Sequence, residues 1–240
     1  MTASVGRSQR PHHASIGGNA LRASVLGAND GLVSNLSLVM GVAGAGLESR
    51  VILITGLAGL LAGACSMAMG EWISVQSSRE LSQRELAVER AEIASFPEEE
   101  HEELVEIYEA RGLSPTVARQ MAEHVMADQD RALEVMAREE LGIDPDDLGG
   151  SAWTAATSSF ALFVAGAVVP VAWFTFLPTR TAVPLSLAAS ALGLFAIGAA
   201  ITHVTQRPPW RSGLRQLAIG LAAALVTYGT GVLLGVSVGA

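Results

Sequence analysis

The chain of 240 residues is 50% apolar and only 16% charged, with a mean hydropathy of +0.40, which excludes a soluble domain of ordinary composition. Its charge is divided sharply, because residues 79–149 hold 20 of the 23 acids and carry a net charge of −13, whereas the rest carries +5. The acidic pI of 5.1 argues against a nucleic-acid ligand, whose phosphates such a surface would repel.

The first predicted element is a polar tail over residues 1–22, followed by an apolar run too long for a signal-peptide core, which we expect to remain as a membrane span. A helix of roughly 20 apolar residues crosses a bilayer. Five segments have this length: 23–47, 51–75, 153–177, 184–204 and 214–238. The predicted fold is therefore an all-α membrane protein of five transmembrane helices, with spans 1–2 in residues 23–78 and spans 3–5 in residues 150–240.

Arginines near the span ends predict the orientation, because basic residues favour the cytosolic side. The N-terminal tail and the fourth loop hold six of them: Arg7, Arg10, Arg22, Arg207, Arg211 and Arg215. The first and third loops offer only Arg50 and Arg180. We therefore expect a cytosolic N-terminus and a C-terminus on the opposite side. Every basic residue is arginine and the chain is rich in alanine, which indicates a GC-rich bacterial genome and the cytoplasmic membrane.

Small residues recur at four-residue spacing in the spans, which lets helix backbones approach closely. The pairs are Gly27 with Gly31, Gly59 with Gly63, and Gly231 with Gly235. They predict either an oligomer seam or ordinary packing within the chain. Pro170 predicts a kink in the third span.

The acidic insert, residues 79–149, is predicted to be a three-helix unit on the cytosolic side. The second span runs on as a helix to Phe96, where Pro97 ends it. A second helix covers about 98–111, and the turn at residues 112–115 leads to a third over about 115–141. The only cysteine, Cys65, lies in an apolar run and excludes a Cys-based metal site.

Carboxylates in the insert recur on single helix faces. Glu85, Glu89 and Glu92 are spaced i, i+4, i+7, and Glu99 or Glu100 repeats the pattern with Glu103 and Glu106. Like charges at these spacings repel, so the cluster predicts a divalent counter-ion. Met136 and Glu140, at i and i+4, would add a thioether that favours transition metals. The alternative is a solvated acidic stalk whose Met136 is core; His101 and His124 are further candidate ligands.

Asp30 stands out in the first span, because an acid within a membrane costs about 2.5–3.5 kcal/mol and is a functional candidate by default. The alternative is a helix-end acid at the membrane interface. Glu71 is expected at the cytosolic end of the second span, and Met67 taken alone is typical of ordinary packing.

Three motifs resemble the vacuolar iron transporter family. They are Gly-Ala-Asn-Asp-Gly-Leu-Val-Ser-Asn at 27–35, Ala-Gly-Ala-Cys-Ser-Met-Ala-Met-Gly-Glu-Trp-Ile-Ser at 62–74, and Glu-x-x-Glu before Phe96-Pro97. The resemblance runs from about residue 20 to the C-terminus. Two membrane motifs in this order, followed by an acidic insert, are far more specific than hydropathy or a glycine pair.

The resemblance implies a homodimer of five-helix subunits in the lipid bilayer, a transporter and not an enzyme. It would move ferrous iron, and often manganese, out of the cytosol in exchange for protons, with no tightly bound cofactor. Matching the family motifs assigns metal ligands in the insert to Glu89, Glu92, Glu100, Glu103, Met136 and Glu140, and the membrane path to Asp30 and Met67.

Two positions depart from the family pattern. Some plant members place an acid where this chain has Gly59, which puts the proton route in question and leaves Glu71 as a substitute. A second insert methionine is replaced by Ala137, which would loosen metal selectivity.

Two other function classes compete with transport. A ferritin-like iron-oxidising protein needs Glu-x-x-His pairs on two helices, and only Glu98 with His101 fits, because Met121 precedes His124 at that spacing. An acidic membrane scaffold would bind a basic partner in a salt-sensitive, metal-independent manner.

Overall fold

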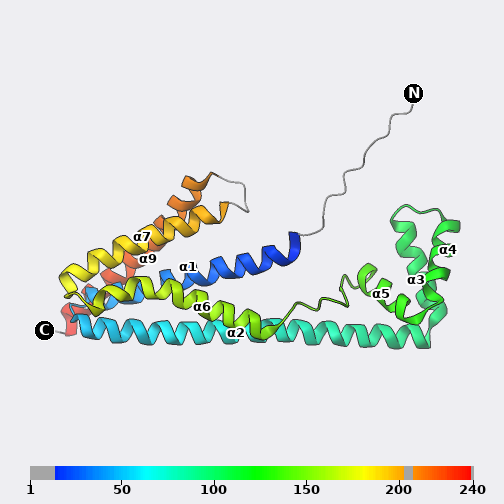
Figure 1. Cartoon of the computed structure of the whole chain (residues 1–240), viewed down its shortest axis with the longest axis horizontal. Helices are drawn as coiled ribbons and strands as arrows, with labels where there is room; N and C mark the ends of the chain where they lie inside the picture. The colour runs from blue at the N-terminus through cyan, green and yellow to red at the C-terminus, as the bar shows by residue number, and fades with distance from the viewer. Residues whose placement is uncertain (1–13, 203–207, 239–240) are drawn as a thin grey trace, which may run out of the picture. The chain divides into compact units, whose positions relative to one another are not determined.

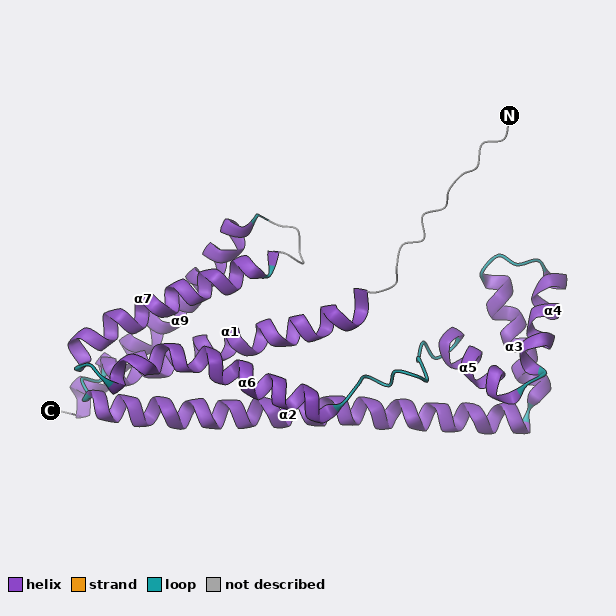
Figure 2. Ribbon diagram, in the orientation of Figure 1, coloured by secondary structure: helices purple, strands orange, loops and turns teal. Residues whose placement is uncertain are grey.

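The computed structural model describes residues 14–202 and 208–238, with side chains for 26–202 and 208–235. The described residues form helices joined by turns and loops, without a strand among them (Figure 2). Arg7, Arg10 and Arg207, on which the predicted orientation partly rests, lie outside the described residues. Helix α1 begins at Ala14, within the predicted polar tail.

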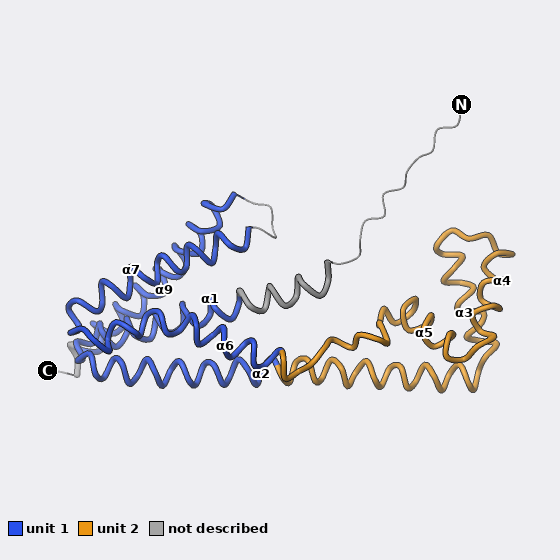
Figure 3. The backbone as a smooth tube through the Cα atoms, in the orientation of Figure 1, with its two compact units in different colours: residues 1–71, 155–240 blue, residues 72–154 orange. Residues whose placement is uncertain are grey.

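The chain divides into two compact units, shown in Figure 3. The membrane unit comprises residues 1–71 and 155–240, and the acidic unit comprises residues 72–154. Helix α2 (Ser49–Ser95) contributes to both, so one continuous helix of 47 residues carries the chain from apolar to acidic sequence (Figure 1). The acidic unit is several residues wider at each end than the predicted insert.

The membrane unit contains α1 (Ala14–Gly44), the apolar half of α2, α6 (Ala152–Val171), the 3₁₀ helix η1 (Ala172–Thr175), α7 (Thr179–Ala200) and α9 (Pro209–Val238). Four described helices are long and apolar enough to cross a membrane: α2, α6 with η1, α7 and α9. These four correspond to the second to fifth predicted spans. Helix α1 is not among them, so the first of the five spans stays a prediction.

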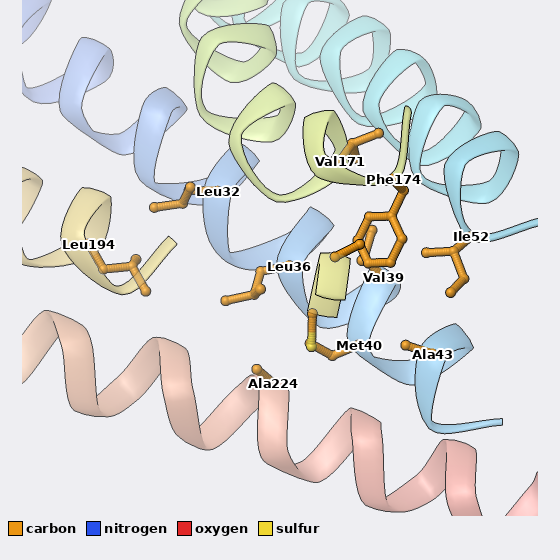
Figure 4. Close-up of a cluster of buried hydrophobic side chains, with 11 residues drawn as sticks. Leu32, Leu36, Val39, Met40, Ala43, Ile52, Val171, Phe174, Leu194 and Ala224 are labelled. Carbon is orange, nitrogen blue, oxygen red and sulfur yellow. The ribbon is translucent and has the colours of Figure 1, made fainter. Parts of the chain in front are cut away.

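Burial explains the lower hydropathy of α1. Its Leu32, Leu36, Val39 and Met40 are buried in the central apolar cluster of the unit, which also takes side chains from α2, α6, η1, α7 and α9. Figure 4 shows Leu32 and Leu36 among Leu194 and Ala224, with Val39 near Phe174. The apolar residues of α1 lie on the face that packs against the other helices, and Asn29 and Asp30 lie outside this cluster, with Asp30 exposed.

The small-residue pairs serve packing within the chain. A side chain at Gly31 would collide with the backbone of Phe163 on α6, and one at Gly231 would collide with the backbone of Gly41 on α1. Gly63 is covered by the ring of Phe163. Of the two interpretations offered by the spacing, the structure supports intrachain packing at Gly31, Gly63 and Gly231, and the oligomer seam stays a prediction.

Pro170 ends the α-helical part of the third span instead of kinking a continuous helix. Helix α6 stops at Val171 and continues as η1. Proline has no N–H to donate and disrupts the helix around it. The carbonyl of Pro170 accepts a hydrogen bond from Ser186 Oγ at 2.8 Å, which ties α6 to α7.

The acidic unit has its own apolar core, formed by the distal half of α2 with α3 (Pro97–Ala110), α4 (Pro115–Met126) and α5 (Gln129–Glu139). The single helix predicted over 115–141 is wrong, because the chain breaks at Asp128. The Asp128 carboxylate accepts from the backbone N–H of Asp130 at 3.0 Å and of Arg131 at 3.1 Å, and so caps a new helix. Trp72 and Trp153 pack edge to face where the chain enters and leaves the unit, with ring centroids 6.0 Å apart.

Candidate metal centre

Three carboxylates from three helices converge in the acidic unit. Glu89 lies on α2, Glu100 in the first turn of α3, and Glu140 at the C-cap of α5, and one oxygen of each lies within 4.8 Å of the others. Pro97 produces this arrangement, since it ends α2 and starts α3 at once. Glu89 and Glu100 lie eleven positions apart in the sequence, yet their carboxylates meet.

Two of the three carboxylates are almost fully buried. Glu89 is 3% exposed and Glu100 is 8% exposed, whereas Glu140 is exposed. Glu89 Oε1 and Glu100 Oε2 have no hydrogen-bond partner in the described part of the chain. A buried, unpaired carboxylate oxygen is costly unless a proton or a cation compensates it. The cluster is therefore built for a positively charged partner.

A pocket of about 280 Å³ opens beside this cluster. Its walls come from α2 and from the C-terminal end of α5, through these residues: Leu81, Arg84, Glu85, Val88, Glu89, Glu92, Glu140 and Leu141. The α2 residues follow the i, i+4, i+7 spacing of one helix face. A small hydrated ion can reach the carboxylates through this opening.

The electrostatics of the cluster favour a bound proton or cation. Burial raises the pKa of Glu89 to about 7, and the charges of Glu140, Glu100, Glu92 and Glu103 contribute in the same direction. Burial also raises the pKa of Glu100 and of Glu140. A hydrogen bond from Glu89 to Glu140 opposes the rise for Glu140. With a pKa of about 7, Glu89 is partly protonated near neutral pH, and a divalent cation would compete with that proton.

The structure treats the predicted insert ligands in three ways. Glu89, Glu100 and Glu140 are brought together, and Glu92 and Glu103 lie exposed but close enough to raise the pKa of Glu89. Met136 is fully buried in the apolar core of the unit, as expected if it is a core residue and not a ligand. Its role as a ligand stays a prediction.

The histidines lie apart from this cluster. His101 is partly buried and is not a member of the carboxylate group, and His124 Nε2 lies 3.2 Å from an Arg131 guanidinium nitrogen. Sequence reasoning missed Arg84, which lines the pocket; its position four residues before Val88 on the same face was the available signal.

In the membrane unit, the predicted pair is placed on α1 and α2. Asp30 is exposed on α1, and its backbone carbonyl accepts from Ser34 Oγ at 2.6 Å. Met67 is partly buried on α2, with its methyl carbon 3.5 Å from where a Cβ of Gly27 would lie. Met67 thus contacts α1 one turn before Asp30. Glu71 is partly exposed at the boundary of the unit.

Comparison with known proteins gives a consistent result. A model of the VIT family matches residues 21–232. The chain is 36% identical over 219 residues to a vacuolar iron transporter of Acanthamoeba castellanii, which covers 91% of this chain and 76% of that protein. It is 30% identical over 212 residues to vacuolar iron transporter 1 of Arabidopsis thaliana, covering 88% and 84% of the two chains. It is 36% identical over 210 residues to vacuolar iron transporter homolog 1 of Oryza sativa subsp. japonica, covering 87% and 71%.

These matches confirm the resemblance read from the membrane motifs. They extend over the apolar helices and the acidic unit alike, so the chain is an integral membrane protein. The family is one of transporters, which confirms the expectation that the chain is not an enzyme. The protein belongs to the VIT family.

Proposed function

We propose that the protein transports ferrous iron across a membrane, with the acidic unit collecting the ion. The observation that carries this proposal is the convergence of Glu89, Glu100 and Glu140 in a chain whose relatives are named vacuolar iron transporters. Three carboxylates leave open coordination positions, which suits an ion that is taken up and passed on. Glu92 and Glu103 at the rim would attract the ion, and Met136 with Glu140 would complete the predicted set.

Manganese is a second cargo in this proposal. Oxygen ligands bind Mn²⁺ and Fe²⁺ alike, and the affinity order of divalent ions separates these two only weakly. If Met136 turned its sulfur toward the cluster, the site would favour transition metals over Mg²⁺ and Ca²⁺. Ala137, in place of a second methionine, would leave that preference modest.

Proton antiport completes the proposed mechanism. The ion would leave the acidic unit for Asp30 and Met67 on α1 and α2 and exit on the side opposite the cytosol, while protons return. A carboxylate that holds either a metal ion or a proton couples the two flows, because binding one requires release of the other. Asp30 is the candidate for this exchange, and Glu71 would relay protons at the boundary of the membrane unit.

A homodimer is proposed because Asp30 is exposed on α1. A charged side chain facing lipid is costly, and a second copy of α1 would cover it and bring two such acids together. The N-terminus and the acidic unit would lie in the cytosol of a bacterial cell, with the protein in its cytoplasmic membrane.

Uptake into proteoliposomes tests the proposal. With the acidic unit facing outward, Fe²⁺ should enter the vesicles, and an inside-acidic pH gradient should accelerate it, because protons then flow outward against the metal. Equal uptake with and without the gradient would contradict antiport. Equal uptake by protein-free vesicles would contradict transport altogether. Repeating the assay with Mn²⁺ determines the second cargo.

A further inference from the structure

Asn35 on α1 is a buried amide whose orientation is fixed. Its side chain is 2% exposed, and Nδ2 donates a hydrogen bond to the carbonyl of Ala167 on α6 at 2.8 Å. Exchanging the two amide atoms would place Oδ1 against that carbonyl, and two acceptors repel each other. The nitrogen therefore holds α6, and Oδ1 points elsewhere.

The oxygen of this amide has no donor. Asn35 Oδ1 is buried and accepts no hydrogen bond within the part of the chain that the structure describes. Leaving a buried acceptor unpaired costs about 1–3 kcal/mol, and the bilayer core offers no water in compensation. By contrast, Ser186 is equally buried in the same unit, and its hydroxyl is paired with the carbonyl of Pro170.

The free oxygen faces α2 at Gly59. A Cβ placed on Gly59 would lie 3.2 Å from Asn35 Oδ1 and would collide with the end of the Leu38 side chain. The absence of a side chain at Gly59 thus leaves room at the oxygen. Leu38 lies nearly one turn after Asn35 and is 36% exposed, so the end of its side chain covers this place and can rotate away.

Helix α6 carries a second acceptor without its ordinary donor, one residue before Ala167. Pro170 has no N–H, so the carbonyl of Gly166 lacks its regular helical donor. Gly166 packs directly against α1, where a Cβ would lie 2.9 Å from the backbone nitrogen of Leu32. Neutral oxygens without their ordinary partners at a helix break are the groups that line ion sites in membrane transporters.

We propose that Asn35 Oδ1 is a neutral oxygen ligand for the transported divalent cation, directly or through one water, between α1, α2 and α6. This inference rests on the proposed transport function and adds a residue to it. A neutral oxygen replaces part of the hydration that the ion loses. A second carboxylate in a low-dielectric environment would bind the ion so tightly that it would be trapped. Asn35 is buried, whereas Asp30 on the same helix is exposed, so the two oxygens act at different places.

The test uses the full chain in proteoliposomes with Fe²⁺ and three variants. Asn35→Leu keeps the volume and removes the oxygen, so uptake should fall roughly tenfold or more, the factor given by about 1.4 kcal/mol. Asn35→Asp keeps an oxygen but makes it titratable, so uptake should persist with a pH profile shifted from that of the wild type. Gly59→Ala leaves Asn35 intact and crowds its oxygen, so the KM for Fe²⁺ should rise. Metal binding by the acidic unit should stay unchanged in all three.

Ser186→Ala is the matched control, because it removes a buried polar group that already has a partner; it should lower the melting temperature and leave uptake per folded molecule unchanged. Wild-type kinetics and pH profile in Asn35→Leu would overturn the inference. If Asn35→Leu does not fold, Asn35→Asp and Gly59→Ala test the inference. Wild-type uptake kinetics and pH profile in both variants would then overturn it. No uptake by the wild type would overturn the proposed function, and this inference with it.

Discussion

The two units of this protein bury oxygen atoms in different chemical forms. The described buried polar groups of the membrane unit are neutral, as in Asn35, Ser186 and Ser190, whereas those of the acidic unit are the carboxylates Glu89 and Glu100. A charge in a lipid environment has no water within reach, so its cost is high. Beside a solvent-connected pocket a carboxylate keeps access to protons and ions. Under the proposed function, the acidic unit would hold the metal tightly and the membrane unit would let it pass.

The largest effect is expected from Asp30, an acid that lies exposed on α1 of the membrane unit. Asp30→Asn keeps the size of the side chain and removes its charge, so the protein should fold and bind metal in the acidic unit while Fe²⁺ uptake falls by about a hundredfold or more, from the lower end of the range for loss of a positioned acid–base group upward. Uptake and size-exclusion profiles measure this together. Asp30→Ala should fail equally. Wild-type uptake by Asp30→Asn would make Asp30 a residue of the membrane interface only.

The next largest effect concerns metal affinity in the acidic unit. Replacing Glu89 and Glu100 by Gln in the full chain should weaken Fe²⁺ or Mn²⁺ binding by about 10–100-fold, as loss of a metal's supporting groups does. Calorimetry measures the affinity. Glu99→Gln is the matched control, because Glu99 neighbours Glu100 in the first turn of α3 but is exposed. Equal loss in the control would mean that general charge, and not the cluster, binds the metal.

A collecting site upstream of the membrane path should alter the dependence on metal concentration and not the maximal rate. Glu89→Ala with Glu92→Ala should therefore reduce uptake at low Fe²⁺ and recover at high Fe²⁺, which appears as a raised KM with little change in kcat. Initial rates across a range of Fe²⁺ concentrations measure both parameters. A lowered kcat with unchanged KM would place these acids on the membrane path itself.

The raised pKa of Glu89 predicts a pH dependence of opposite sign for binding and for stability. Below the Glu89 pKa of about 7 a proton competes with the metal, so the metal affinity should rise with pH and level off above pH 7.

Without metal, Glu89 in the folded state keeps its proton up to a pH of about 7, whereas in the unfolded chain it releases the proton above its ordinary pKa of 4.5. Stability of the acidic unit should therefore fall as pH rises from 4.5 to 7. Calorimetric titration at several pH values tests the dependence of metal affinity, and thermal melting tests the dependence of stability. Glu89→Gln should flatten both pH dependences.

The smallest effect is structural and confined to the acidic unit. Asp128→Ala removes the N-cap of α5 and should destabilise the unit by about 1 kcal/mol. Because α5 positions Glu140, metal affinity should fall slightly, and saturating metal should restore the melting temperature. Asp130→Ala, one residue into the same helix, is the control. A loss as large as that from Glu89→Gln would show that α5 is marginal without its cap.

The sequence by itself determined the helical class, the second to fifth spans, the family and the helix faces that carry the acids. Apolar length, i, i+4 spacing and the two membrane motifs are local properties, so they can be read without a fold. The same spacing could not distinguish Glu100 from Glu103, because both lie on the acidic side of α3.

Only the tertiary structure decided which of these groups meet. The turn at Pro97 brings Glu100 to Glu89, and the break at Asp128 ends the long helix that the sequence predicted and leaves α5 to carry Glu140. Packing buries Met136 in the core and brings one face of α1 into the central apolar cluster. It also leaves Asn35 Oδ1 buried without a hydrogen-bond partner among the described residues. Burial and convergence depend on residues far apart in the chain, and no local pattern encodes them.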